Sequence, residues 1–167
     1  MMKLKELKET DKDILKHLIE NSNQTHKQIS DKIGTTRQTI SQRIRKLEKS
    51  KVINSYSIKI DLEQIEELQT KAYILFREDP DEKIRKKNEE KIKSMSEVTE
   101  FSRLFGLYDG LLKIIVQDNS ALKELVKTLQ NFDGIKETET FIIHTRVKDD
   151  EMAPILHLLE INDKVKS

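Results

Sequence analysis

Apolar residues between positions 26 and 50 recur with the spacing of α-helices. In chain order these positions are Ile29, Ile33, Ile40, Ile44 and Leu47. Intervals of three or four residues place side chains on one face of a helix, whereas a strand alternates every two residues. The pattern therefore predicts two helices, one over residues 26–33 and a longer one over residues 37–50.

The residues around these segments are typical of helix ends. Thr25 and Thr36 precede the two segments, and a threonine hydroxyl can accept a hydrogen bond from a backbone N–H of the first turn. Gly34 follows the first segment, where a left-handed residue commonly ends a helix. An earlier apolar face is formed by Ile14, Leu15, Leu18 and Ile19. Together these features predict a three-helix unit that ends in a helix-turn-helix.

The outward face of the second helix has side chains that suit DNA. At 100° per residue, Gln38, Gln42 and Arg45 project away from the apolar stripe. Amide and guanidinium groups match the donors and acceptors of base edges in the major groove. A solvated face of a helical bundle is the alternative, but the glycine turn, the two caps and this face occur together and favour DNA. The candidate DNA-binding residues are Thr25, Thr36, Arg37, Gln38, Thr39, Ser41, Gln42, Arg43, Arg45 and Lys46.

Charge is distributed unevenly along the chain, whose formal net charge is +1. Residues 1–60 carry 14 Lys and Arg against 7 Asp and Glu, and residues 61–167 carry 17 against 23. The first part, at +7, suits a polyanion such as double-stranded DNA, and the second, at −6, does not. The chain has no cysteine and nothing that resembles a signal peptide or a membrane-spanning run. We therefore expect a cytoplasmic protein without disulfides or a membrane partner.

Residues 51–61 alternate apolar and polar side chains, which predicts a short strand pair, or wing, after the second helix of the motif. The polar residues that follow predict a linker. The chain accordingly divides into a winged helix-turn-helix domain (1–61), a linker (62–69), a second domain (70–148) and a C-terminal tail or short helix (149–167).

The second domain mixes strand and helix patterns. Strands are predicted over residues 71–77, 98–105, 111–117 and 135–147, and helices over 80–95 and 121–132. The order β-α-β-β-α-β is that of the ferredoxin-like split βαβ unit, so the fold class is α+β. Two helices cover only one face of such a sheet, yet both faces of 71–77 and 111–117 are apolar. We expect the uncovered face to bind a second copy of the chain.

Residues with catalytic or metal-binding chemistry are scattered. The four histidines lie far apart, and no glycine-rich phosphate loop occurs. We therefore expect no catalytic site, no metal site and no resident cofactor. The strand at 111–117 lacks the aromatic residues on which a ferredoxin-like RNA-binding sheet stacks bases.

The combination of a basic winged helix-turn-helix and a ferredoxin-like domain resembles the Lrp/AsnC family of transcription regulators. The similar segments are residues 11–53, the loop GLYDGLLK at 106–113 and TETFII at 138–143. The resemblance implies DNA-binding dimers, often stacked into tetramers or octamers, that respond to an amino acid or related small molecule.

The resemblance also implies an effector site near the glycine–aspartate loop and the last strand. By position, its residues are Gly106, Tyr108, Asp109, Leu111, Thr138 and Thr140. The Asp109 carboxylate would bind an ammonium group, glycine amides would bind a carboxylate, and threonine hydroxyls would complete the polar ring. The alternative is that Asp109 only holds the turn and that the threonines are ordinary strand residues.

Two departures from the family pattern occur. Lys51 stands where glycine is usual before the wing, which predicts a strained turn, and Arg37-Gln38 replaces a common Ser-Pro start of the recognition helix.

A rival function also fits the sequence. A DNA-packaging protein with low sequence preference and no effector would keep the same basic first domain and oligomeric second domain.

Overall fold

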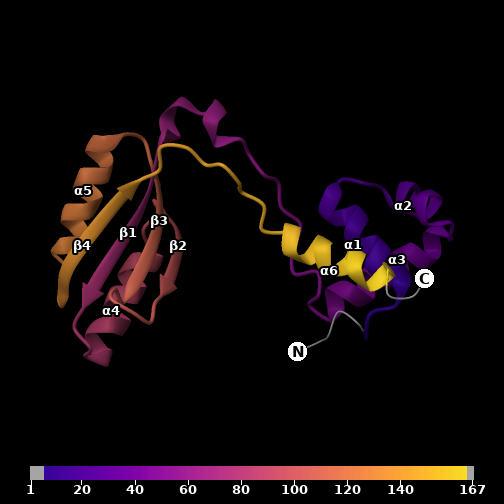
Figure 1. Cartoon of the computed structure of the whole chain (residues 1–167), viewed down its shortest axis with the longest axis horizontal. Helices are drawn as coiled ribbons and strands as arrows, with labels where there is room; N and C mark the ends of the chain where they lie inside the picture. The colour runs from indigo at the N-terminus through magenta and orange to yellow at the C-terminus, as the bar shows by residue number, and fades with distance from the viewer. Residues whose placement is uncertain (1–5, 165–167) are drawn as a thin grey trace. The chain divides into compact units, whose positions relative to one another are not determined.

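The chain forms two compact units. The computed structural model describes residues 6–164. One unit comprises the residues up to Lys59 together with those from Lys148 onward, and the other spans Ile60–Val147. The chain therefore leaves the first unit and later returns to it, as the colours of Figure 1 show. Among the described helices, none has the length and apolar character needed to cross a membrane.

The first unit contains the predicted helix-turn-helix. Its helices are α1 (Glu9–Glu20), α2 (His26–Ile33) and α3 (Arg37–Lys49). Thr25 and Gln28 form a capping box at the start of α2, and Thr36 accepts a hydrogen bond from the Thr39 backbone N–H at the start of α3. Gly34 ends α2 with φ at 74°, in the left-handed region that favours glycine. The predicted caps and turn are confirmed.

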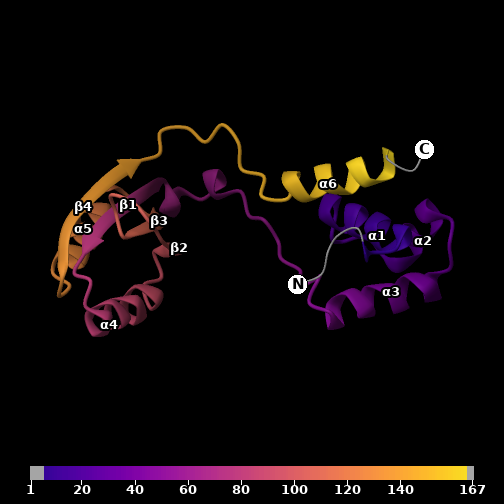
Figure 2. The same cartoon turned by 60° about the horizontal axis from the view of Figure 1, so that its bottom comes forward.

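A fourth helix, α6 (Ala153–Lys164), packs against α1 in the same unit and lies alongside it in Figure 2. Leu159 is fully buried, and Ile155 is partly buried beside it. The helix-turn-helix contributes Ile14, Leu15, Ile29, Ile40, Ile44 and Leu47 to this core. The predicted C-terminal tail or short helix over residues 149–167 contains α6, whose Ile155 and Leu159 form an apolar stripe that α1 covers, and residues 165–167 lie outside the described residues.

Residues 51–61 differ from the predicted wing. They run without strand pairing in the described part of the chain, and Tyr56, Ile58 and Ile60 are exposed. Alternation predicts extended backbone, but a strand also needs a neighbouring strand with which to exchange hydrogen bonds. Lys51 has φ at 59°, so the strained turn expected from its departure from the family glycine is confirmed.

The second unit is a four-stranded antiparallel sheet in the order β2-β3-β1-β4. The elements are β1 (Thr70–Glu78), α4 (Glu82–Lys93), β2 (Val98–Arg103), β3 (Gly110–Val116), α5 (Asn119–Gln130) and β4 (Ile135–Ile142). This order confirms the predicted ferredoxin-like, α+β fold. Two short 3₁₀ turns, η2 (Leu62–Gln64) and η3 (Glu66–Leu68), occupy the predicted linker and belong to this unit.

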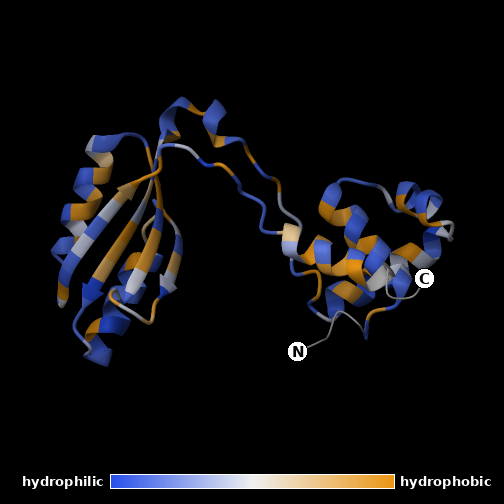
Figure 3. Cartoon of the chain, viewed as in Figure 1, coloured by the Kyte–Doolittle hydropathy of each residue, from blue (hydrophilic) through white to orange (hydrophobic). Residues whose placement is uncertain are grey.

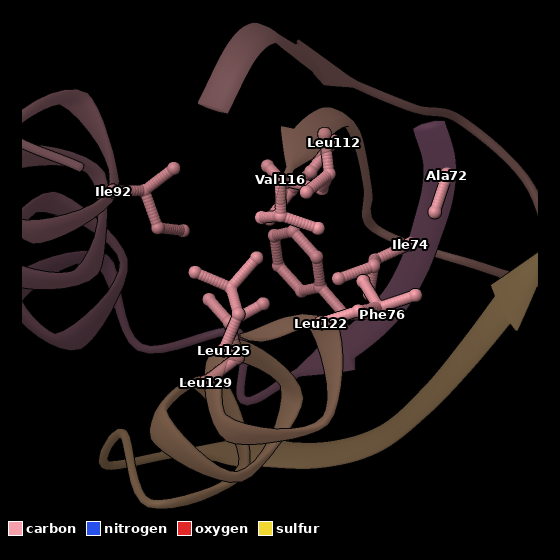
Figure 4. Packing of buried hydrophobic residues seen from close by; sticks show 10 residues of the cluster. Ala72, Ile74, Phe76, Ile92, Leu112, Val116, Leu122, Leu125 and Leu129 are labelled. Atoms are coloured by element: carbon pink, nitrogen blue, oxygen red, sulfur yellow. The ribbon is translucent and has the colours of Figure 1, made fainter. Parts of the chain in front are cut away.

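Helices α4 and α5 cover one face of the sheet. There, Phe76 and Leu112 from the strands pack with Ile92 of α4 and Leu125 of α5 (Figure 4). Figure 3 shows hydrophobic residues along much of β1 and β3. The opposite face carries Tyr73, Leu75, Leu111, Ile115 and Phe141, which are half-buried or exposed. Both faces are therefore apolar, as the sequence predicted.

Among the element boundaries that differ from prediction, two have a clear structural cause. Helix α4 begins at Glu82 with Asp81 as its cap, so Pro80 lies outside it, because the Asp81 carboxylate accepts hydrogen bonds from two first-turn amides. Strand β4 ends at Ile142, five residues early. Its partner β1 begins at Thr70 and pairs Ala72 with Ile142, so little of β1 remains beyond that point for β4 to pair with.

Candidate DNA-binding and effector sites

Helix α3 presents a polar and basic face to solvent. The side chains of Gln38, Gln42 and Arg45 are exposed, and none of them has a hydrogen-bond or ion-pair partner among the described residues. Arg37 and Lys46 are exposed as well. These five side chains are free to contact base edges or phosphates. They are the members of the predicted DNA-binding set whose side chains are exposed and have no partner among the described residues.

The threonines of the predicted DNA-binding set, Thr25, Thr36 and Thr39, make hydrogen bonds within the protein. The Gln28 backbone N–H donates to Thr25 Oγ1 at 3.2 Å, and the Thr39 backbone N–H donates to Thr36 Oγ1 at 3.1 Å. The Thr36 and Thr39 hydroxyls lie 2.8 Å apart. These contacts fix the starts of α2 and α3. Ser41 is half-buried on the flank of α3.

Arg43 differs from the prediction that it faces DNA. Its Nε lies 3.1 Å from Oδ1 of Asp11 on α1, and the two side chains are 18% and 6% exposed. On α3, Arg43 sits three residues after Ile40 and four before Leu47, so it lies beside the buried stripe. The guanidinium therefore contacts α1 and is only partly exposed to solvent. Spacing alone did not reveal this, because the partner is on another helix.

In the second unit, the carboxylate of Asp109 is engaged within the protein. Asp109 Oδ1 lies 2.9 Å from Arg85 Nη2, and Oδ2 accepts the Glu78 backbone N–H at 3.0 Å. The backbone of Asp109 also bonds to Phe76 and Leu104. Asp109 thus ties the loop before β3 to the end of β1 and to α4.

Asp109 belongs to a charge network that the sequence analysis missed. The side chain of Glu78 is fully buried and forms ion pairs with Arg85 and Arg103, while Arg103 also contacts Glu89. A signal was present in the sequence. Glu78 continues the alternation of the core-facing residues of β1, where a charged residue requires a partner. Within the described residues, no group of three or more acidic or histidine side chains could hold a metal ion.

Three of the six predicted effector residues lie in the loop before β3, and the other three lie in strands, on two faces of the sheet. Leu111 pairs with Leu75 on the uncovered face, whereas Thr138 pairs with Phe76 and Thr140 with Ile74 on the helix-covered face. The residues are therefore not gathered into one pocket within a single chain.

The two subsets have different surroundings. Near the uncovered face, the Tyr108 hydroxyl donates to Glu139, and this hydrogen bond raises the pKa of Tyr108, which keeps the hydroxyl protonated. On the other face, Thr138 accepts a hydrogen bond from Gln130 of α5. Thr140 lines an open groove of about 360 Å³ between α5 and β4.

A glycine permits close packing at the end of the loop before β3. A Cβ at Gly110 would lie 2.3 Å from the Phe76 ring, so only glycine fits there without moving the core. Gly106 is exposed in the same loop, with no heavy atom near its Cβ position. The loop is therefore anchored at Asp109 and Gly110 and open at Gly106.

Two family models match this chain. A winged helix-turn-helix DNA-binding model matches residues 7–54, and the Lrp/AsnC ligand-binding domain model matches residues 71–153. The chain belongs to the Lrp/AsnC family. The resemblance drawn from its sequence is confirmed, and with it the assignment of a DNA-binding transcription regulator with a ligand-binding domain.

Relatives of this Lrp/AsnC protein cover most of its length. An uncharacterised HTH-type transcriptional regulator of Pyrococcus furiosus is 29% identical over 146 residues, which is 86% of this chain and 97% of the relative. The leucine-responsive regulatory protein of Escherichia coli is 26% identical over 147 residues, which is 86% of this chain and 88% of that protein.

A solved structure has the same fold. A transcriptional regulator of Neisseria meningitidis, crystallised in complex with L-Met, superposes with a TM-score of 0.85 at 24% identity, over 91% of this chain and 99% of that one. Helix α6 of the Lrp/AsnC protein, however, lies beyond both matched family segments apart from Ala153.

Proposed function

We propose that this protein binds specific DNA sequences in the cytoplasm as a homodimer and that an amino acid controls this binding. The observation that carries the DNA part is the exposed face of Gln38, Gln42 and Arg45 on a helix whose start is fixed by caps. Glutamine pairs with adenine and arginine with guanine in the major groove. The unpartnered apolar face of the sheet supports a two-fold dimer, which would read half-sites about 10 bp apart or a multiple of that.

The effector part rests on the family and on the loop before β3. The matched model is that of a ligand-binding domain, and two relatives are named for a response to leucine or a complex with L-Met. We propose that the ligand contacts the loop side, at Gly106, Tyr108, Asp109 and Leu111. Thr138 and Thr140 would contribute from the groove beside α5 only if a second subunit or a rearrangement joins the two faces.

DNA packaging is the second candidate function, because a packaging protein would have the same basic charge in its first unit. A regulator and a packaging protein both neutralise DNA phosphates. They differ in sequence selectivity, because only a regulator reads base edges strongly. A packaging protein would also need no effector.

The deciding experiment compares two duplexes of equal length at fixed salt. One is enriched by the full-length protein from a random-sequence pool, and the other is unselected. We expect the enriched duplex to bind at least about 1,000-fold more tightly, and one amino acid from a panel that includes L-Leu and L-Met to change this ratio. Equal affinity for both duplexes would support packaging, and a selective protein that ignores the whole panel would refute the effector part alone.

A further inference from the structure

The ion pair between α1 and α3 is the strongest structural feature that the DNA-reading face leaves unexplained. Asp11 is 4% exposed, and its Oδ1 accepts no hydrogen bond from the described residues. Its charge partner is Arg43, with Nε at 3.1 Å from that oxygen. Arg43 also follows Gln42 directly in the recognition helix. An acidic side chain on α1 thus contacts the helix that carries the base-reading residues.

Apolar side chains also pack between α1 and α3. Ile14 of α1 and Ile40, Ile44 and Leu47 of α3 belong to one buried cluster. Apolar burial is non-directional, so this cluster resists separation of the helices more strongly than rotation of α3 about its own axis. A buried charge is different, because moving its partner away leaves it without that compensation in a medium of low dielectric constant. The ion pair therefore opposes rotation.

We propose that Asp11 is a specificity-determining positioning residue. By holding Arg43, it sets the rotation of α3 and thereby the direction in which Gln38, Gln42 and Arg45 point. A rotation of about 20° would move a side-chain tip roughly 6 Å from the helix axis by about 2 Å. The donor–acceptor distance of a good hydrogen bond varies by only about 0.5 Å. Base contacts would fail after such a rotation, whereas contacts to phosphates by flexible lysines would persist.

Two simpler roles make different predictions for the same residues. If Arg43 contacts a phosphate, its loss should weaken binding to all DNA and lower the salt dependence by about one phosphate, while loss of Asp11 should have little effect. If the pair serves stability alone, an apolar replacement of both residues should restore binding along with stability, since such replacements of buried ion pairs are often neutral.

The test uses the full-length protein and the enriched and unselected duplexes described above. The variants are Asp11→Asn, Arg43→Gln and the pair Asp11→Leu with Arg43→Met, each accompanied by a thermal melt. Asp13→Asn is the matched control, because Asp13 is a partly exposed acid on the same helix whose Oδ1 lies 3.7 Å from Lys16 Nζ. Binding is measured well below the melting temperature of every variant.

We expect Asp11→Asn and Arg43→Gln each to lower the ratio of specific to non-specific affinity by about tenfold or more, as loss of a base contact does. Affinity for unselected DNA and its salt dependence should stay within about twofold of wild type. The paired apolar variant should recover the melting temperature but not the ratio, and Asp13→Asn should match wild type in both.

Three results would overturn the proposal. The first is an unchanged ratio in Asp11→Asn, and the second is full recovery of the ratio in the paired variant. The third is a weaker salt dependence in Arg43→Gln without any effect of Asp11→Asn. The proposal rests on sequence-specific binding, and a wild-type ratio near one would refute that function directly, before any variant is compared.

Discussion

Lys51 holds a left-handed backbone conformation directly after the recognition helix, with φ at 59°. This conformation costs a residue with a Cβ about 1–2 kcal/mol, and glycine avoids that cost. Glycine also raises the backbone entropy of the unfolded chain, which cancels part of the gain in stability. We expect Lys51→Gly to raise the free energy of unfolding by about 0.5–1 kcal/mol in urea titrations. Lys49→Gly, in the last turn of α3, should lower it by a similar amount. Equal losses in both variants would contradict strain at Lys51.

Gln38 and Gln42 are the residues on which base reading depends most directly. Loss of either amide should cost about 1–3 kcal/mol in binding to the enriched duplex, because a bidentate contact to adenine disappears. Lys46→Ala should weaken binding to all duplexes alike, since a flexible ammonium meets phosphates. Fluorescence anisotropy titrations measure both effects. Unchanged discrimination in Gln38→Ala and Gln42→Ala would mean that another face of α3 enters the groove.

At Asp109, removing the charge distinguishes a role in effector binding from a purely structural role in the turn. Asparagine can still accept the Glu78 N–H, and Arg85 keeps Glu78 as a partner, so Asp109→Asn should fold. If the carboxylate also binds a ligand ammonium, effector affinity should drop about tenfold to a hundredfold by calorimetry. Asp118→Asn is the matched control, because either residue caps α5 equally well. Equal affinity in the wild type and the Asp109 variant would leave Asp109 a purely structural role.

At the scale of elements, α6 acts as part of the DNA-binding unit. Leu159→Ala should lower the free energy of unfolding of that unit by about 2–5 kcal/mol, because it leaves a cavity where a side chain was fully buried. Leu158→Ala makes the same change at a side chain that is 48% exposed and should cost much less. Hydrogen exchange can follow the amides of α1 to α3 separately from those of the sheet. Equal protection of α1 in the two variants would show that α6 does not stabilise it.

Most elements followed from local patterns, and the differences came from contacts distant in sequence. The spacing of Ile40, Ile44 and Leu47, the caps and Gly34 placed α2 and α3 closely, because a helix bonds within its own segment. A strand ends where its partner strand ends, so the alternation of residues could not predict where β4 stops. For the same reason, alternation in residues 51–61 could not show whether they pair with a neighbouring strand.

The candidate sites show the same division. The exposed face of α3 could be predicted from periodicity, but Arg43 could not be assigned, because Asp11 lies on another helix. The effector residues could be placed in the chain from the family resemblance. Their separation onto two sheet faces followed only from the register that pairs Leu111 with Leu75 and Thr140 with Ile74.

At the scale of the whole molecule, the uncovered sheet face should hold two subunits together. Phe141 is 47% exposed and pairs with Tyr73 on that face, whereas its neighbour Ile142 is 56% exposed and points to the helix side. We expect Phe141→Glu to raise the dimer dissociation constant by about 30-fold or more, as loss of an aromatic anchor does. Ile142→Glu should leave it nearly unchanged. Sedimentation equilibrium measures both, and dissociation by Ile142→Glu alone would place the interface on the other side.

The position of α6 also determines when each unit can be completed during translation. The second unit consists of residues 60–147, whereas the core around Ile14 and Ile40 also contains Leu159. At about 5–20 residues per second, the ribosome needs roughly 5–20 s to add the residues between Lys59 and α6. During that interval the helix-turn-helix has part of its apolar surface uncovered, and the last strand of the sheet, β4, is made before α6. The unit that begins first in the sequence therefore finishes folding last.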